Sequence, residues 1–519
     1  MVVVRTAAPS RRPFANPEYG ACRLSAIHED AAALSGAAAR PFIDGALSTS
    51  ASKETIDVIN PSNGRPCLSL PVGSSIDVDR AVAAARRAYD EGRWSEQSPL
   101  QRKQVLLRLA DLITREGPAL DALDAEEMGK PVGESFANAA AAAALMRFYA
   151  EAVDKLAGDV YASGRKSLVV QRRVARGVVA AIVPWNFPTY VAVLKSAPAL
   201  AAGNCVVLKP SELSTRSAAR LGHLATAAGL PPGVLNVVPG LGATVGQALA
   251  HHMDVDMVTF TGSTAIGKLI LQYAGQSNMK VVMSECGGKS PHVVFADGMN
   301  LQAVGDAIAQ RLLCNQGQIC SVGSRLLVER SIEKPLVQRI AERCAQVVIG
   351  DARDPATTFG PLASAKQHAR VMRYIESAAT EGAQLVCGGR RALPAQNGYF
   401  VEPTVFRDVL PSSRLAQEEV FGPVLAVTSF ESEVEAVRLA NSTPYGLAAY
   451  VWTNDLSRGM RMAKSIRSSV WINAAAPSDE GAGFATSCEP AGQSGIGVEG
   501  GLAGMEAYLR RQLIAVSHA

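Results

Sequence analysis

Cys320 is the first residue of this sequence whose type and setting could do chemistry. It ends the run Asn-Gln-Gly-Gln-Ile-Cys at 315–320, after an apolar stretch with helical spacing and before small residues. A cysteine reacts as its thiolate, so it needs surroundings that favour the charged form or a base nearby. The alternative is a small buried apolar residue, which is the more common fate of a cysteine. This stretch alone leaves both interpretations open.

Two other side chains could assist a reaction at a thiol. Glu285 begins the run Glu-Cys-Gly-Gly-Lys-Ser and could act as a general base. Asn186 lies in Pro-Trp-Asn-Phe-Pro at 184–188, where the two prolines fix a rigid turn. Its side-chain NH2 could stabilise an oxyanion that forms at Cys320.

The elements that must position these residues alternate between strand and helix from residue 178 to about 290. Such alternation predicts an open, mostly parallel sheet with helices on both faces. Ligands bind such sheets at the carboxyl ends of the strands, where both motifs lie. We expect strands at 178–183, 205–208, 234–238, 257–260 and 281–284, and helices near 190–201, 214–228, 243–252 and 264–274.

Other strand ends carry groups that could hold a ligand. Lys209 and Glu212 follow the second strand, although alone they indicate only a helix cap with a charged first turn. Gly262 and Ser263 open a helix whose backbone N–H groups could meet a phosphate. The glycines of residues 240–246 approximate a dinucleotide fingerprint, but the third is one place late and the expected acidic residue is missing. We therefore interpret them as a tight turn.

Six motifs, taken in order, resemble the aldehyde dehydrogenase superfamily over residues 41 to 515. They are Pro-Trp-Asn-Phe-Pro at 184–188, Lys-Pro-Ser-Glu at 209–212, Phe-Thr-Gly-Ser at 260–263, Glu-x-Gly-Gly-Lys-Ser at 285–290, Asn-x-Gly-Gln-x-Cys at 315–320 and Glu-Val-Phe-Gly-Pro at 419–423. The resemblance implies an α/β fold with two Rossmann-like open-sheet domains and a small β arm for oligomerisation. It implies NAD as cofactor, with NADP possible.

The same resemblance implies a role for each matching residue. Cys320 matches the nucleophile, Glu285 the general base and Asn186 an oxyanion donor, and Lys195 falls at the family's lysine position. The positions at the cofactor are Trp185, Lys209, Glu212, Gly262, Ser263, Glu419 and Phe421. Those at the substrate tunnel are Phe187, Val191, Leu194, Ile319 and Ser321, with Phe484 as a further candidate. Because these are mostly apolar, we expect a neutral, apolar aldehyde.

The implied activity is oxidation of an aldehyde to a carboxylic acid. The aldehyde would bind covalently to Cys320 and pass a hydride to NAD(P), and water activated by Glu285 would release the acid. An inactive structural relative, an acylating enzyme that uses coenzyme A, and a thiol hydrolase are the alternatives. Acylating relatives typically lack the Glu285 carboxylate, and a thiol hydrolase needs a base for its cysteine, usually histidine, which is not near either motif in sequence.

Length and composition agree with a large globular enzyme. The 519 residues suggest two large domains, and 51 basic against 47 acidic residues give no reason to expect nucleic acid or a membrane as partner. Nine cysteines without a C-x-x-C pair favour a reducing compartment such as the cytoplasm, and argue against a structural zinc site. No metal is expected.

The domain boundaries follow from the resemblance and from changes in pattern. We expect an N-terminal extension at 1–40, a cofactor domain at 41–157 and 177–287, and a catalytic domain at 288–499. The segments 158–176 and 500–519 should form an arm that pairs with another subunit, giving a homodimer or homotetramer. The loop at 474–492 departs from the family's usual run, which leaves that wall of the tunnel undefined.

Overall fold

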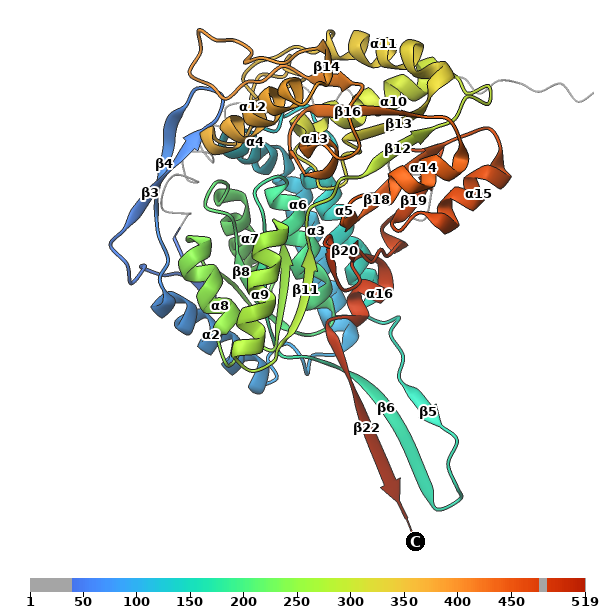
Figure 1. The fold of residues 1–519 in the computed structure, drawn as a ribbon. Coiled ribbons are helices and arrows are strands. Elements are labelled where there is room, and N and C mark those ends of the chain that lie inside the picture. The colour runs from blue at the N-terminus through green and yellow to red at the C-terminus, as the bar shows by residue number, and fades with distance from the viewer. Residues whose placement is uncertain (1–39, 476–482, 519) are drawn as a thin grey trace, which may run out of the picture.

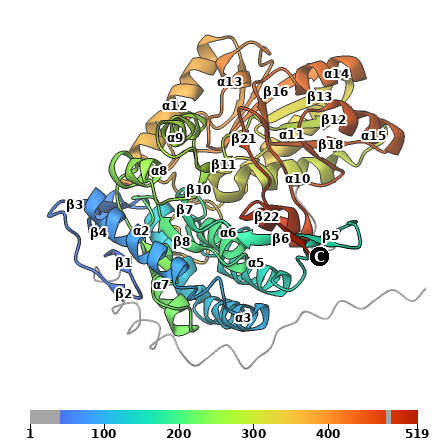
Figure 2. The same ribbon diagram turned by 90° about the horizontal axis from the view of Figure 1, so that it is seen from below.

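The computed structural model describes residues 40–475 and 483–518. Two large sheets, each covered by helices, lie side by side, and a narrow three-stranded arm projects from one end (Figures 1 and 2). Residues 1–39 of the expected extension and residues 476–482 of the 474–492 loop therefore fall outside the described residues. In the part of the chain that is described, no helix is both long and apolar enough to cross a membrane.

The first sheet has eight strands in the order β2-β1-β9-β8-β7-β10-β11-β21. Its five central strands are parallel, as the alternating pattern predicts: β7 (Val178–Ile182), β8 (Cys205–Lys209), β9 (Leu235–Val237), β10 (Met257–Thr261) and β11 (Val281–Glu285). Antiparallel strands border them: β1 (Phe42–Ile43), β2 (Ala46–Leu47) and β21 (Gly495–Ile496). Strand β21 comes from the far end of the chain, within the range expected for the catalytic domain.

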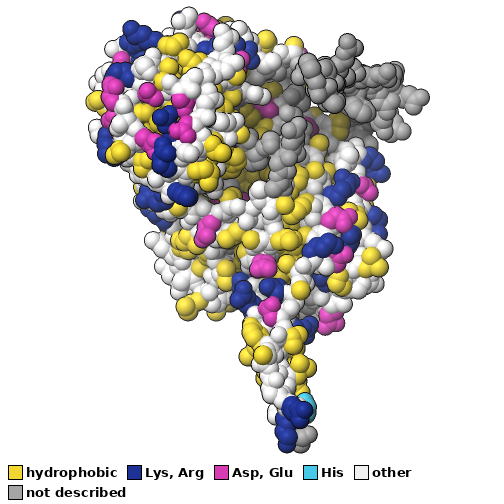
Figure 3. All heavy atoms as spheres, turned by 90° about the vertical axis from the view of Figure 1, so that its right-hand side faces the viewer, with side chains coloured by type: hydrophobic (Ala, Val, Ile, Leu, Met, Phe, Trp, Pro, Cys, Tyr) yellow, Lys and Arg dark blue, Asp and Glu magenta, His cyan; other side chains and the backbone are white. Residues whose placement is uncertain are grey.

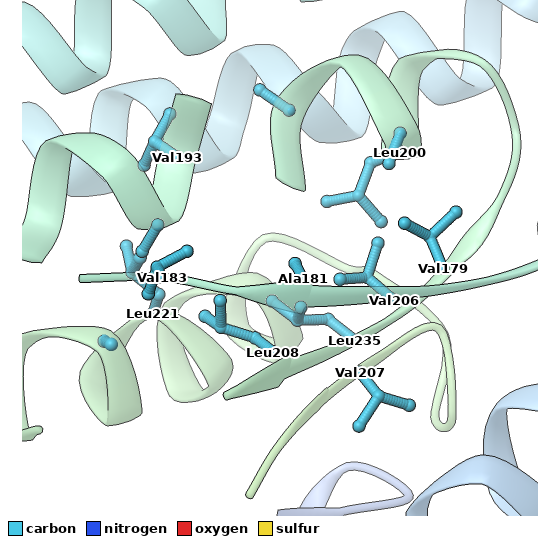
Figure 4. Close-up of a cluster of buried hydrophobic side chains, with 14 of the residues drawn as sticks. Val179, Ala181, Val183, Val193, Leu200, Val206, Val207, Leu208, Leu221 and Leu235 are labelled. Atoms are coloured by element: carbon cyan, nitrogen blue, oxygen red, sulfur yellow. The ribbon is translucent and has the colours of Figure 1, made fainter. Parts of the chain in front are cut away.

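The helices around this sheet are α2 (Ser75–Asp90), α3 (Pro99–Arg115), α4 (Gly117–Met128), α5 (Ala139–Ala152), α6 (Pro188–Ala201), α7 (Arg216–Ala227), α8 (Gln247–His251) and α9 (Thr264–Gln276). The central strands β7 and β8 are buried along their whole length and are rich in Val and Ala, as expected for strands covered on both faces. Val206 points toward α6 and Val207 points to the opposite side of the sheet (Figure 4).

Local sequence determines where two of these helices begin. Helices α3 and α4 are separate because the chain bends at Glu116 and Pro118 starts a new first turn. Helix α5 begins at Ala139, where the Asn138 side chain caps it by accepting from Ala141 N.

The second sheet has seven strands in the order β14-β15-β16-β13-β12-β18-β19, and only β14 is antiparallel to its neighbour. The strands are β12 (Pro291–Val294), β13 (Arg325–Glu329), β14 (Gln384–Cys387), β15 (Thr404–Arg407), β16 (Val424–Phe430), β18 (Ala448–Trp452) and β19 (Ser469–Ile472). The main helices are α10 (Leu301–Leu313), α11 (Glu333–Cys344), α12 (Ala365–Thr380), α14 (Glu433–Ala440) and α15 (Leu456–Ser465).

The arm consists of β5 (Asp159–Tyr161), β6 (Ser167–Ala175) and β22 (Leu509–Ser517). Strands β6 and β22 pair antiparallel along their whole length within one chain, so the two segments expected to form the arm do come together. Helix α16 (Gly501–Glu506) precedes β22 and packs on α6 of the body. A separate hairpin of β3 (Thr55–Asn60) and β4 (Arg65–Pro71) lies on the outside (Figure 1).

Candidate active site

The candidate nucleophile lies in a strained turn between α10 and β13. Asn315, Gln316 and Gly317 have positive φ angles of 45°, 55° and 69°. Three successive left-handed residues, two of them not glycine, are costly and persist only where the surroundings hold them. A Cβ at Gly317 would lie 2.4 Å from Gly422 O, so this position needs glycine for space as well. The turn brings Cys320 out of the core to a half-buried position.

Hydrogen bonds tie this turn to the Pro-Trp-Asn turn after β7. Asn315 Nδ2 donates to Asn186 O at 2.8 Å, and Asn186 Nδ2 donates to Gln318 O at 3.0 Å. Gln318 is fixed in turn, since its Oε1 accepts from Ala363 N at 3.0 Å. The Asn186 side chain is therefore bonded to Gln318, which lies two positions before Cys320 in the chain. The second N–H of its amide nitrogen remains available for another acceptor.

The thiol of Cys320 lies among carboxylates. Burial raises the pKa of the Cys320 thiol to about 12, and the charges of Glu419, Glu285 and Glu499 add to the rise, whereas Arg311 opposes it. The resting thiol is therefore protonated at neutral pH, and a base must remove its proton before it can attack.

Glu285 ends β11 in the same region and is buried. Its Oε1 has no hydrogen-bond partner among the described residues. Burial raises the pKa of this carboxyl to about 8, the charge of Glu499 raises it further, and Lys195 opposes both. A carboxyl group that titrates near neutrality and is free to bind water suits a general base.

Lys195 and Glu499 form a buried ion pair beside Glu285. Lys195 projects from α6, while Glu499 lies in the segment after β21 and pairs through its backbone with Cys488, with both N···O distances 2.9 Å. The sequence analysis singled out Lys195 but missed Glu499. Nothing in local spacing marks Glu499, because its partners are distant in the chain.

The expected cofactor residues also gather at the strand ends of the first sheet. Gly262 N donates to Glu285 O at 3.0 Å, and Ser263 caps α9 by accepting from Ile266 N at 3.4 Å. Lys209 Nζ donates to Pro210 O at 2.6 Å and lies 3.9 Å from the Glu212 carboxylate. Burial lowers the pKa of Lys209 to about 8, and Glu212 opposes this.

Residues 240–246 lie next to this group. A Cβ at Gly246 would lie 3.6 Å from Lys209 Cδ. The segment makes the tight turn that the sequence predicts and leads into a short π-helix (Gly242–Gly246). The π-helix continues as α8.

Glu419, Phe421 and Trp185 come together from the two sheets. The half-buried Glu419 carboxylate accepts from Gly288 N at 3.1 Å, and desolvation raises the pKa of this carboxyl to about 7. The rings of Trp185 and Phe421 meet edge to face with centroids 5.3 Å apart. The structure thus brings the Cys320 turn, the Asn186 amide and the Glu285 carboxylate together near the strand ends of the first sheet.

Comparison with known proteins identifies the family. The model of the aldehyde dehydrogenase family matches residues 48–514. The chain belongs to the aldehyde dehydrogenase family. It is an oxidoreductase that acts on aldehydes and converts them to acids.

Relatives in this family cover almost the whole chain. The NADP/NAD-dependent aldehyde dehydrogenase PuuC of Escherichia coli is 45% identical over 84% of this chain and 87% of its own length. The betaine aldehyde dehydrogenase of Bacillus subtilis is 40% identical over 90% and 95%. Among solved structures, an indole-3-acetaldehyde dehydrogenase in complex with NAD+ is 44% identical, with a TM-score of 0.91 over 95% of this chain and 99% of that chain.

The positions that the family resemblance assigns to the aldehyde tunnel are mostly apolar in the structure. Phe187, Val191 and Ile319 are buried, and Leu194, Ser321 and Phe484 are half-buried. The structure adds Phe136, whose ring meets that of Phe187 edge to face at 5.4 Å. It also adds Arg311, whose guanidinium lies over the Phe136 ring with Cζ 4.7 Å from the centroid. The sequence analysis noticed neither residue.

Ser494 holds the backbone that follows Glu285. Ser494 Oγ donates to Gly287 O at 2.8 Å and accepts from Gly446 N at 3.0 Å, and Ser494 O accepts from Cys286 N at 2.8 Å. The Gly-Gly run after Glu285 is thereby fixed on one side by Ser494 and on the other by Glu419. A Cβ at Gly287 would lie 2.3 Å from Glu419 Oε2, which explains why a glycine stands there.

Proposed function

We propose that Cys320 is the nucleophile of an NAD(P)-dependent oxidation of an aldehyde to its carboxylic acid, and that Glu285 activates the hydrolytic water. The observation that carries this assignment is the reciprocal bonding of Asn186 with the nucleophile turn, at 2.8 and 3.0 Å. It fixes an amide donor next to the thiol before any substrate binds, which is the preorganisation that oxyanion stabilisation requires.

The residues would act in the following order. Cys320 Sγ, after losing its proton, bonds to the aldehyde carbon, and the carbonyl oxygen becomes an oxyanion that accepts from Asn186 Nδ2 and from Cys320 N. NAD(P), when bound, supplies the hydride acceptor. Cys320 then carries a thioester, and Glu285 takes a proton from the water that attacks it. The acid leaves and the thiolate returns. The Glu285 carboxylate favours hydrolysis over transfer to coenzyme A.

Lys195 and Glu499 would set the proton affinity of Glu285. Glu499 adds negative charge that raises the pKa of the Glu285 carboxyl, and Lys195 counters it. The pair therefore keeps this carboxyl close to the pH at which a base both takes up and releases protons efficiently.

The strand ends of the first sheet carry groups that suit a dinucleotide. The first turn of α9, which Gly262 and Ser263 precede, presents backbone N–H groups that fit a pyrophosphate. Lys209 and Glu212 suit the adenosine ribose hydroxyls, and Glu419 suits the second ribose, with Trp185 and Phe421 beside it. On this assignment residues 41–157 and 177–287 form the cofactor domain, and 288–499 the catalytic domain.

We further propose a substrate class, a compartment and an oligomeric state for this enzyme. The apolar positions assigned to the tunnel favour an aldehyde with an apolar chain next to the reacting carbon. The cysteines of the described residues are all free thiols, which suits a reducing compartment such as the cytoplasm. The arm presents open strand edges, which favours a homodimer or homotetramer.

Exchange of each cysteine in the nucleophile turn tests the assignment. Cys320→Ala should abolish reduction of NAD+ with any aldehyde, because no other thiol replaces the nucleophile. Cys314→Ala is the matched control, since Cys314 lies in the same turn but is buried, and it should retain substantial activity. The measurement is reduced cofactor formed per minute without coenzyme A. An active Cys320→Ala with a dead Cys314→Ala would contradict the assignment.

A further inference from the structure

Three arginines are buried among the described residues, and they differ in how their charge is satisfied. Arg216 donates to the carboxylates of Glu126 and Glu127 at 2.6 and 2.8 Å. Arg325 donates to three backbone carbonyls, including Lys289 O at 2.8 Å. Each of these two therefore has a complete set of partners, as a buried guanidinium requires.

Arg311 lacks a complete set of hydrogen-bond or ion-pair partners among the described residues. The residue is only 7% exposed, yet its guanidinium forms no ion pair with a carboxylate of the described residues. Its Nη2 donates to Ser321 Oγ at 2.8 Å and reaches Ser321 O only at 3.5 Å, and its Nε has no partner among the described residues. A buried charge with one good neutral partner is costly, so a site of this kind calls for an anion.

The position of this guanidinium connects it to the reaction centre. Ser321, which accepts a hydrogen bond from Arg311, directly follows Cys320. The Cα atoms of Cys320 and Ser321 are therefore about 3.8 Å apart. On the other side it covers the ring of Phe136, which contacts Phe187, the residue after the oxyanion donor. Both neighbours of Arg311 thus belong to the wall of the proposed tunnel.

The nearby histidine leaves the charge around Arg311 unchanged. His292 is fully buried, accepts from Trp452 Nε1 at 3.2 Å and stacks on Tyr450 at 4.7 Å. Burial lowers the pKa of His292 to about 3, and the charge of Arg311 lowers it further, so His292 is neutral at pH 7. The group next to Arg311 is therefore uncharged, and the guanidinium retains its full charge.

We propose that Arg311 binds a carboxylate at the far end of a short aldehyde substrate, making this enzyme selective for aldehyde acids. The fork of guanidinium N–H groups matches a carboxylate in geometry and charge. The short path through Ser321 favours a short chain, whose few methylene groups would lie against the apolar wall. This differs from the neutral aldehyde that the sequence analysis expected, because the residues considered there did not include Arg311. The inference rests on the proposed function of the same site.

A pair of aldehydes that differ only in the terminal group gives the test. Succinic semialdehyde and butanal are compared by kcat/KM with NAD+, in the parent and in Arg311→Met. The parent should prefer the anionic aldehyde, and Arg311→Met should lower that preference by about tenfold or more, since a buried charge would lose its partner. Arg311→Lys should keep part of it. Arg438→Met, a change on an exposed side chain, is the control and should leave the ratio unchanged.

The outcomes separate the inference from the function on which it rests. The inference is wrong if the parent has the same kcat/KM for butanal and for succinic semialdehyde, or if Arg311→Met lowers both kcat/KM values by the same factor. The aldehyde dehydrogenase assignment stands in either case. If the parent oxidises neither aldehyde nor any other, the proposed function itself fails.

Binding without turnover gives a second readout. Succinate should bind to Cys320→Ala, by calorimetry, at least about tenfold more tightly than to the double variant Cys320→Ala, Arg311→Met. Equal binding in two variants with the same melting temperature would overturn the inference.

Discussion

The candidate active site contains more negative than positive charge. Glu285, Glu419 and Glu499 all raise the pKa of the Cys320 thiol, and Arg311 opposes them. Burial and these carboxylates together favour the neutral form of the Cys320 thiol. Positive charge that a ligand brings near the thiol would favour the thiolate.

Glu212 should determine the choice between NAD and NADP. Its side chain is 38% exposed and lies 3.9 Å from Lys209 Nζ. A 2′-phosphate about 4 Å from this carboxylate would be repelled by roughly 4 kcal/mol at an effective dielectric near 20, and solvent and Lys209 reduce that figure. We expect a preference for NAD of about ten- to a thousand-fold in kcat/KM, or roughly 1.4 to 4 kcal/mol.

The comparison of Glu212→Ser with the parent checks this preference, using both cofactors and one aldehyde. The variant should gain activity with NADP. Equal use of both cofactors by the parent, or no gain in the variant, would show that Glu212 is only a charged helix-start residue turned away from the ribose.

At the scale of elements, the sequence placed most site residues because strand ends are recognisable. The expected strands at 178–183, 205–208 and 281–284 coincide with β7, β8 and β11 to within a residue or two. In a parallel sheet their carboxyl ends meet at one edge, so Asn186, Lys209 and Glu285 gather there. The resemblance to the aldehyde dehydrogenase family then suggested a role for each of these three residues.

Other features could not be predicted from local pattern. The two-residue strand β21 has no periodicity to detect, yet it pairs Gly495 with Glu285 and so brings Glu499 to the site. The left-handed run at 315–317 includes Gln316, a residue type that gives no signal for positive φ. It depends on hydrogen bonds with two residues that are distant in the chain: Asn186 O accepts from Asn315 Nδ2, and Ala363 N donates to Gln318 Oε1. Partners of this kind appear only in the folded structure.

At the scale of the whole molecule, the arm is the feature that lies apart from the two sheets. It extends away from the body and carries apolar side chains along its length (Figure 3). Val160, Leu168, Leu513 and Val516 are 74, 46, 60 and 47% exposed. In the order β22-β6-β5 the outer edges of β22 and β5 are unpaired. Open edges with exposed apolar side chains favour pairing with another subunit.

Light scattering of the parent and of Leu513→Asp tests this pairing. We expect the parent to be a closed oligomer at micromolar concentration, and the variant to dissociate at higher concentration, because a charge would be buried in the interface. Val434→Asp is the control, since Val434 is 81% exposed on the body at α14. A fully active monomeric parent would refute the role of the arm.

The central claim is that oxidation proceeds through a thioester on Cys320 that Glu285 helps to hydrolyse. Glu285→Gln keeps the shape of the side chain and removes the base, so hydrolysis should slow more than thioester formation. Rapid mixing with NAD+ and aldehyde should give a burst of about one reduced cofactor per active site, followed by a slow steady state. Intact mass should show the acyl group in Glu285→Gln and not in Cys320→Ala, Glu285→Gln. A Glu285→Gln protein that turns over like the parent, without a burst, would contradict the account.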